Sequence, residues 1–150
     1  MAANELKSRA LRLLAIREHS LMELKRKLTA KASADDDVEA VLNRMVETGL
    51  QSDQRFAESY VRSRGGRLGT ARLKHELAER GIADDLVQSA LTQELGSDEL
   101  TRARVVWTKK FGTPPAGAAE WAKQARFMQS RGFNVDVIRK LLKEPFDESA

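Results

Sequence analysis

One spacing of apolar residues recurs along the chain, and this recurrence limits the folds that the chain can adopt. Four aliphatic residues are each matched by an aliphatic residue 49 positions later: Leu24 by Leu73, Leu28 by Leu77, Val38 by Val87 and Leu42 by Leu91. A further set is matched at a shift of 51: Arg80-Gly81-Ile82 by Arg131-Gly132-Phe133, Val87 by Ile138 and Leu91 by Leu142. Self-similarity at such a period indicates several copies of one supersecondary unit.

Each copy has the pattern of a group of helices. Its apolar residues recur every three or four positions, which places them on one face of a helix. Ser20 and Glu23 have the spacing of a capping box at a helix start, and Asp35-Asp36-Asp37 supplies negative charge where the next helix begins. Gly81 has the position and type of a residue that closes a helix in the left-handed conformation. The prediction is an all-α protein.

The repeat also predicts the domain organisation. Three tandem three-helix repeats of about fifty residues are expected, at 1–51, 52–96 and 97–144, followed by a tail at 145–150. A unit of that length is near the lower size limit for independent stability, so neighbouring repeats are expected to share buried surface. Because each repeat would contact only its neighbours, the expected architecture is an elongated, curved array.

Composition limits which cellular compartment and which class of binding partner fit this chain. The chain has 26 Lys and Arg against 22 Asp and Glu, with a pI near 9.6, which favours an acidic partner such as nucleic acid or an acidic protein surface. It has no cysteine, so disulfides and thiolate metal sites are excluded. No segment approaches the roughly 20 apolar residues of a membrane span, and the first residues lack the apolar run of a signal peptide. A cytoplasmic protein is expected.

Catalytic, cofactor and metal sites are poorly supported. The only two histidines, His19 and His75, are far apart and flanked by charges, and each is expected to be an exposed or interfacial helix residue. Adjacent carboxylates at 35–37 point in different directions and fit helix capping better than cation binding. The glycines at 65–69 lack the Lys-Ser/Thr ending of a phosphate-binding loop and are interpreted as a helix–helix turn. A protein without enzymatic activity, cofactor or metal is expected.

Basic residues are the remaining candidates for a functional site. Residues 62–80 contain six Lys or Arg against two acids, and residues 1–31 contain eight against three, whereas residues 32–61 contain two against seven. As single residues these are ordinary solvated helix positions, but as a set they form a candidate partner-binding surface around the Gly65-Gly66 turn. The candidates are Arg62, Arg64, Arg67, Arg72 and Lys74, with Lys25, Arg26 and Lys27 of the first repeat.

Three ordered motifs make the chain similar to a known family. They are Leu13-Leu14-Ala15-x-Arg17-x-x-Ser20-x-x-Glu23-Leu24-x-x-x-Leu28, Gly49-Leu50-x-x-Asp53-x-Arg55-Phe56-Ala57-x-x-Tyr60-Val61-x-x-Arg64 and Arg72-Leu73-x-x-Glu76-Leu77-x-x-x-Gly81-Ile82. Together with the three-helix repeat, these motifs and their order make the chain resemble the RecX regulatory proteins over about residues 9–142. The resemblance implies a non-enzymatic modulator, mainly an inhibitor, of the RecA filament on single-stranded DNA in DNA repair and the SOS response. Our hypothesis from the charge distribution is that the basic residues of the middle repeat named above supply much of the contact with the filament, with those of the first repeat assisting.

Other classes of function remain open at this point. Three-helix units with basic second helices are also typical of helix-turn-helix DNA-binding proteins, which would bind duplex DNA without RecA. A structural adaptor for another complex would depend on neither DNA nor RecA. Contact with single-stranded or duplex DNA through the basic residues is compatible with the first two classes. A monomer is expected in each case.

Overall fold

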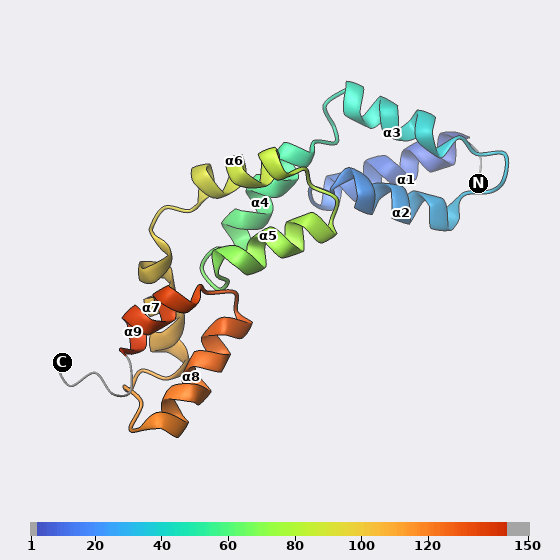
Figure 1. Ribbon diagram of the computed structural model, residues 1–150. Helices are drawn as coiled ribbons and strands as arrows, with labels where there is room; N and C mark the ends of the chain where they lie inside the picture. Colours follow the sequence, from blue (N-terminus) through green and yellow to red (C-terminus); the bar gives the residue numbers. More distant parts are fainter. Residues whose placement is uncertain (1–2, 144–150) are drawn as a thin grey trace. The chain divides into compact units, whose positions relative to one another are not determined.

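The computed structural model describes residues 3–143, and throughout that range the regular structure is helical, with no strand (Figure 1). The helices are α1 (Ala3–Ile16), α2 (Leu21–Lys31), α3 (Val38–Glu47), α4 (Asp53–Arg64), α5 (Thr70–Glu79), α6 (Asp84–Glu94), α7 (Glu99–Lys110), α8 (Ala118–Ser130) and α9 (Val135–Leu142). They form three successive groups of three, so the predicted all-α fold of three-helix repeats is confirmed. The predicted tail at 145–150 lies outside the described residues.

Local capping chemistry sets the helix ends much as the pattern predicts. Ser20 and Glu23 form the capping box of α2, in which the Ser20 hydroxyl accepts from the Glu23 amide and the Glu23 carboxylate accepts from the Ser20 amide. Asp37 caps α3 by accepting a hydrogen bond from the Ala40 amide. Gly81 follows α5 with φ of 80°, a conformation that favours glycine.

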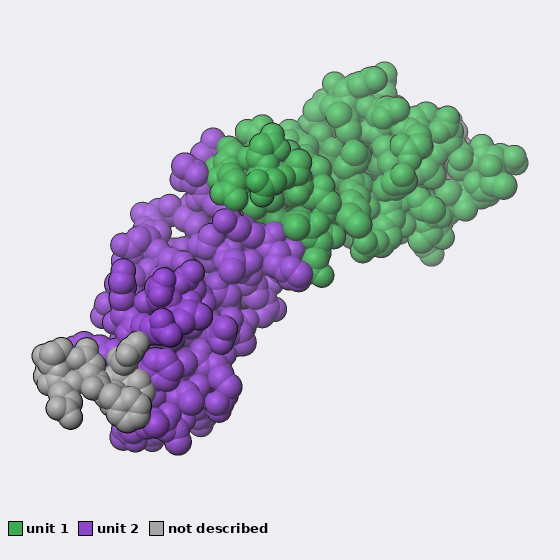
Figure 2. Space-filling model, viewed as in Figure 1, with its two compact units in different colours: residues 1–60, 77–90 green, residues 61–76, 91–150 purple. Residues whose placement is uncertain are grey.

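The chain divides into two compact units (Figure 2). Unit 1 runs to Tyr60 and includes Leu77–Ala90, and unit 2 comprises Val61–Glu76 and the chain from Leu91 onward. In unit 1, α1, α2 and α3 pack around one aliphatic cluster of fully or nearly fully buried side chains: Leu6, Ala10, Leu24, Leu28, Leu42 and Met45. The cluster contains Leu24, Leu28 and Leu42 of the aliphatic repeat, and Val38 packs against it.

Unit 2 has its own core, which is formed mainly by α7, α8 and α9. Its buried members are Ala103, Met128, Phe133, Ile138 and Leu142, with Trp107 and Trp121 packed at the edge. Gln124 is buried and bridges α7 to the proline-containing loop, since it accepts from Trp107 Nε1 at 2.8 Å and donates to the Thr113 carbonyl at 3.1 Å. The loop between α7 and α8 is thereby attached to the core of unit 2.

The repeat spacing is visible in burial as well as in sequence. Leu24 and its counterpart Leu73 are both fully buried, and Leu28 and Leu77 are fully buried as well. Burial of equivalent leucines shows that the sequence repeat reports a repeat in structure, because side chains at matching helix positions face matching interiors.

Candidate partner-binding groove

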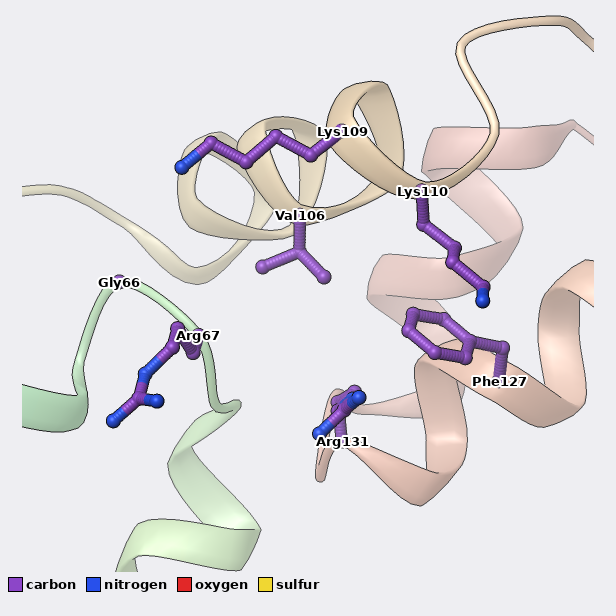
Figure 3. Close-up of a pocket in the computed structure, with 7 residues that line it drawn as sticks. All are labelled: Gly66, Arg67, Val106, Lys109, Lys110, Phe127 and Arg131. Carbon is purple, nitrogen blue, oxygen red and sulfur yellow. The ribbon is translucent and has the colours of Figure 1, made fainter.

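A basic groove lies in unit 2, where the turn after α4 meets α7 and α8 (Figure 3). Its volume is about 360 Å³, and it is lined by Gly66, Arg67, Val106, Lys109, Lys110, Phe127 and Arg131. All four cationic side chains are exposed, whereas Val106 and Phe127 are half-buried and form the apolar part of the lining. We call these seven residues the basic groove.

The Phe127 ring organises two of the four cations. The Arg131 guanidinium lies 4.9 Å from the ring centroid and the Lys110 ammonium lies 5.2 Å from it, both in cation–π contact. Phe111 packs against the same ring edge-on, with centroids 5.5 Å apart. In Figure 3 the Lys110 and Arg131 side chains both extend beside Phe127. The same ring therefore stabilises both cations.

The turn that carries Gly66 and Arg67 is held by the buried Arg102 of α7. Its Nη2 donates to the Leu68 carbonyl at 2.8 Å and its Nε donates to the Gly65 carbonyl at 3.1 Å. Burial lowers the pKa of Arg102, and the nearby Glu99 acts in the opposite direction, but an arginine remains charged in this situation. The guanidinium therefore satisfies the carbonyl groups of the turn and determines the position of Arg67.

A backbone contact brings the Arg131 end of the groove to the same turn. The Gly69 amide donates to the Arg131 carbonyl at 2.7 Å. A side chain at Gly69 would overlap the backbone of Gly132, which has φ of 89° and itself lies against Arg72. Two glycines are needed here because the two backbones approach too closely for a Cβ atom.

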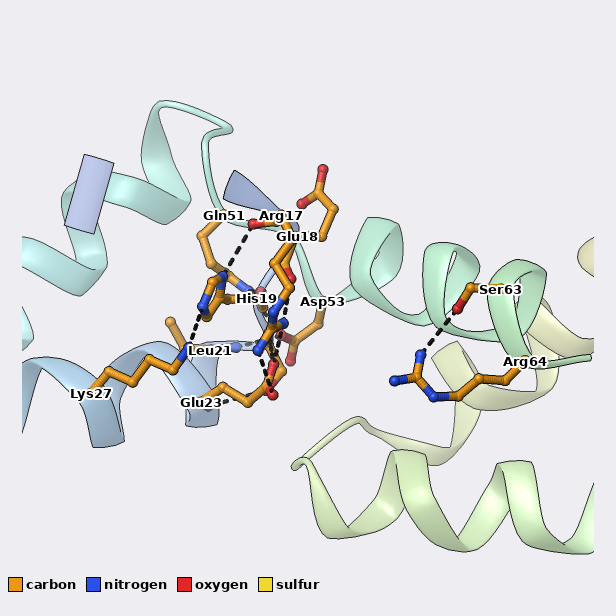
Figure 4. Close-up of polar contacts among 11 residues, drawn as sticks. Arg17, Glu18, His19, Leu21, Glu23, Lys27, Gln51, Asp53, Ser63 and Arg64 are labelled. Carbon is orange, nitrogen blue, oxygen red and sulfur yellow. Dashed lines mark hydrogen bonds and ion pairs between the residues drawn. The ribbon is translucent and has the colours of Figure 1, made fainter. Parts of the chain in front are cut away.

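Arg67 is the one basic residue expected from the sequence that is among the seven residues of the basic groove. Arg67 lines the basic groove, whereas Arg62 pairs with Glu94 at 3.1 Å and Arg72 pairs with Glu76 at 2.8 Å and donates to the Ser130 carbonyl. Arg64 donates to the Ser63 hydroxyl at 3.0 Å (Figure 4), and Lys74 is exposed. Their role as partner contacts stays a prediction.

The three basic residues of α2 belong to unit 1 and have different surroundings. Lys25 pairs with Glu39 at 2.8 Å, and Arg26 is exposed. Lys27 is half-buried, and its ammonium donates to Nε2 of His19 at 2.9 Å. Lys27 is therefore a member of an internal polar cluster as well as a candidate contact residue.

That polar cluster contains His19, which was expected to be an exposed or interfacial helix residue but lies in the turn between α1 and α2 (Figure 4). His19 lies between α1 and α2 with only 1% of its surface exposed, and its ring contacts the Arg17 carbonyl through Nδ1 at 3.1 Å. Gln51 donates to the His19 carbonyl, and Asp53 accepts from both the Gln51 side chain and the Leu21 amide. Burial lowers the pKa of His19, so the neutral ring is favoured. The charged neighbours of His19 suggested a position on a helix, but the turn between α1 and α2 places the His19 ring in the interior of unit 1.

Sequence reasoning missed three of the four cations in the basic groove. Lys109, Lys110 and Arg131 lie outside both basic stretches, residues 1–31 and 62–80. The adjacent pair Lys109-Lys110 at a helix end, and the repeated Arg-Gly-apolar motif that contains Arg131, were the available signals. Within residues 3–143, no group of three or more potential metal ligands is found, and none of the helices is long and apolar enough to cross a membrane.

Family models assign each of the three helix groups. The model described as the first three-helix domain of RecX matches residues 7–45, the second three-helix domain matches 52–91 and the third matches 97–142. The chain belongs to the RecX family. These matches cover most of the chain, in the same order as the helix groups of the structure.

Curated relatives have the same assignment. "Regulatory protein RecX" of Chromobacterium violaceum is 44% identical over 137 residues, which are 91% of this chain and 88% of the relative. The protein with the same description from Leptothrix cholodnii is 45% identical over 147 residues, 95% of this chain and 93% of the relative. The relatives are thus described as regulatory proteins, and the similarity extends over nearly the whole length of this chain and of each relative.

Solved structures support the fold. The crystal structure of RecX from Lactobacillus salivarius has a TM-score of 0.75 with 21% sequence identity and covers 94% of each chain. A second structure, described as regulatory protein RecX, has a TM-score of 0.74 with 22% identity and covers 95% of this chain and 72% of the other. At these identities the likeness concerns the arrangement of helices.

Proposed function

We propose that the chain is a non-enzymatic regulator that binds the RecA filament on single-stranded DNA and mainly inhibits its ATPase, recombinase and coprotease activities. Its role would then be in DNA repair and the SOS response, in the cytoplasm, as a monomer. Membership of a family whose curated members are described as regulatory proteins is the observation that carries this proposal.

The basic groove supports the same proposal from the chemistry. A filament of protein on DNA exposes both phosphates and carboxylates, and four exposed cations around one groove complement either anion. Arginine residues at such a site can bind a carboxylate or phosphate through two parallel hydrogen bonds. Arg67 is the residue that belongs both to the groove and to the surface predicted from the sequence.

The test is the rate of ATP hydrolysis by RecA on single-stranded DNA, titrated with this protein at two salt concentrations. We expect a progressive fall in rate well below one molecule of this protein per RecA subunit, because one regulator bound to a filament affects several subunits. The inhibition is expected to weaken at the higher salt concentration, because exposed charges are screened.

A flat ATPase rate over the same titration would contradict the proposal. Tight binding of duplex DNA in the absence of RecA would then favour the helix-turn-helix class of function. Binding to neither RecA nor DNA would favour an adaptor for another complex.

A further inference from the structure

Within the described part of the chain, the cations of the basic groove lack the internal ion pairs that several other basic residues form. Arg17, Arg55, Arg62 and Arg72 each form a salt bridge with a glutamate of this chain. Arg67, Lys109, Lys110 and Arg131, by contrast, form no ion pair with any carboxylate among residues 3–143. Four positive charges are therefore gathered in one concave site without an internal counterion, which leaves the groove complementary to an external anion.

The aromatic content of the groove argues against single-stranded nucleic acid as that anion. Sites for single strands combine a basic track with aromatic rings on which bases stack. Phe127 is the one aromatic residue that lines the groove, and its ring is already engaged by Arg131, Lys110 and Phe111. The ring acts as a support for two cations and is not a free platform for a base.

The apolar part of the lining favours a protein segment. Val106 and Phe127 are half-buried between the cations, and a volume of about 360 Å³ is sufficient for a few side chains. A peptide that alternates acidic and apolar side chains would place carboxylates on the cationic rim and an apolar group on Val106. A sugar–phosphate backbone has no equivalent of that apolar group.

We propose that the basic groove docks an acidic segment of a protein partner, with carboxylates bound by Arg67, Lys109, Lys110 and Arg131 and an apolar side chain seated on Val106. This inference rests on the proposed function: it assigns the groove to the protein subunits of the regulated filament and not to its DNA. Arg102 and Gly69 act as positioning residues, because they hold the two sides of the groove together.

Two glycines provide a matched pair of variants for the test. A Cβ atom added at Gly66 or at Gly96 would meet no atom within 4 Å, and neither residue has a positive φ. Gly66→Glu places a carboxylate among the groove cations, whereas Gly96→Glu makes the same change of net charge outside the groove. Unchanged thermal unfolding of both variants would show that any difference in binding comes from the groove.

The first measurement is fluorescence anisotropy with three labelled probes: a peptide of alternating glutamate and leucine, the same peptide with serine in place of leucine, and oligothymidine. We expect the glutamate–leucine peptide to bind most tightly. Gly66→Glu should weaken its binding about tenfold, because a like charge then faces its carboxylates, and Gly96→Glu should have little effect. If Gly66→Glu does not fold, the comparison of Lys110→Gln with Arg126→Gln replaces it.

Three results would overturn the inference. Equal binding of the leucine and serine peptides would show that Val106 does not bind an apolar side chain of the peptide. A loss of oligothymidine binding as large as the loss of peptide binding in Gly66→Glu would make the groove a general polyanion site. Equal effects of Gly66→Glu and Gly96→Glu would show a response to net charge alone.

The RecA ATPase assay separates failure of this inference from failure of the proposed function. If the parent protein inhibits the ATPase and Gly66→Glu inhibits it equally well, the groove does not dock the filament although the regulator assignment stands. If the parent protein does not inhibit the ATPase, the proposed function itself fails. Loss of inhibition in Gly66→Glu, with retention in Gly96→Glu, supports both.

Discussion

The amide of Gly69 donates a hydrogen bond to the carbonyl oxygen of Arg131 over 2.7 Å, so the turn between α4 and α5 is attached directly to the end of α8. The two residues are far apart in sequence, and each belongs to a segment that lines the basic groove. The close approach of the backbones makes Gly69 a position at which the stability of unit 2 can be tested.

Gly69→Ala is expected to lower the free energy of unfolding by about 1–3 kcal/mol, because the new methyl group would overlap the backbone of Gly132. Gly66→Ala is the control, since an added Cβ there meets no atom within 4 Å. Urea unfolding followed by circular dichroism measures both variants. Equal stability of the two variants would contradict the described contact.

Arg102→Met is expected to cost about 2–4 kcal/mol of unfolding free energy, because the carbonyl groups of Gly65 and Leu68 would lose their buried donor. Arg104→Met serves as the control, because Arg104 is exposed on the same helix. Differential scanning calorimetry gives the comparison. A change as small as that of the control, within about 0.5 kcal/mol, would show that the guanidinium does not hold the turn.

Asp53→Ala is expected to destabilise unit 1 by about 1–2 kcal/mol, because the Leu21 amide at the start of α2 would lose its acceptor. The Gln51 side chain would lose its 2.9 Å hydrogen bond to Asp53 as well. Asp35→Ala, at an exposed position, removes the same charge and should change little. Thermal unfolding of the two variants decides whether the capping contact exists in solution.

The stability of unit 1 is expected to depend on pH through His19. Lysine can only donate, so Nε2 of the neutral ring accepts from Lys27 and the proton lies on Nδ1, which donates to the Arg17 carbonyl. Burial lowers the pKa of His19 below its ordinary value of 6.5. The unfolded chain therefore binds a proton more readily, and stability falls as the pH drops below about 6.5 until the folded-state pKa is reached.

The size of this pH dependence is bounded by one proton, or about 1.4 kcal/mol per pH unit. His19→Gln, which keeps a polar side chain without a titration in this range, should flatten the profile between pH 7 and pH 5. Glu23 contributes to the pH dependence of stability only at lower pH. Burial would raise its pKa, but hydrogen bonds from Arg17 and the Ser20 amide outweigh this and lower it. An unchanged slope in His19→Gln would contradict the assignment.

The helices of the fold could be predicted from the sequence because the interactions that begin and end them are local. The capping box at Ser20 and Glu23, and the left-handed Gly81, act over three to five residues, and each occurs where the pattern places it. Only part of the candidate site could be predicted from the sequence. Arg67 was predicted, but its neighbours in the groove come from α7 and α8, and no local signal connects them to the turn after α4.

Long-range polar contacts show where repetition ceases to predict structure. Asp53 accepts from the amide that starts α2, whereas Arg102 donates to carbonyls of the turn before α5. The aliphatic repeat predicts neither contact, because each depends on one polar side chain and on the segment packed against it.

The sequence alone determined that this chain is helical, that it consists of three three-helix repeats, and that the matched leucines Leu24, Leu28, Leu73 and Leu77 are interior. Those features follow from helical periodicity and capping, whose interactions span a few residues. Only the tertiary structure decided that Arg67, Lys109, Lys110 and Arg131 share one groove and that His19 is buried. Both depend on long-range contacts, such as the Arg102 to Leu68 hydrogen bond between residues 34 positions apart. Such contacts exist only after the helices have packed.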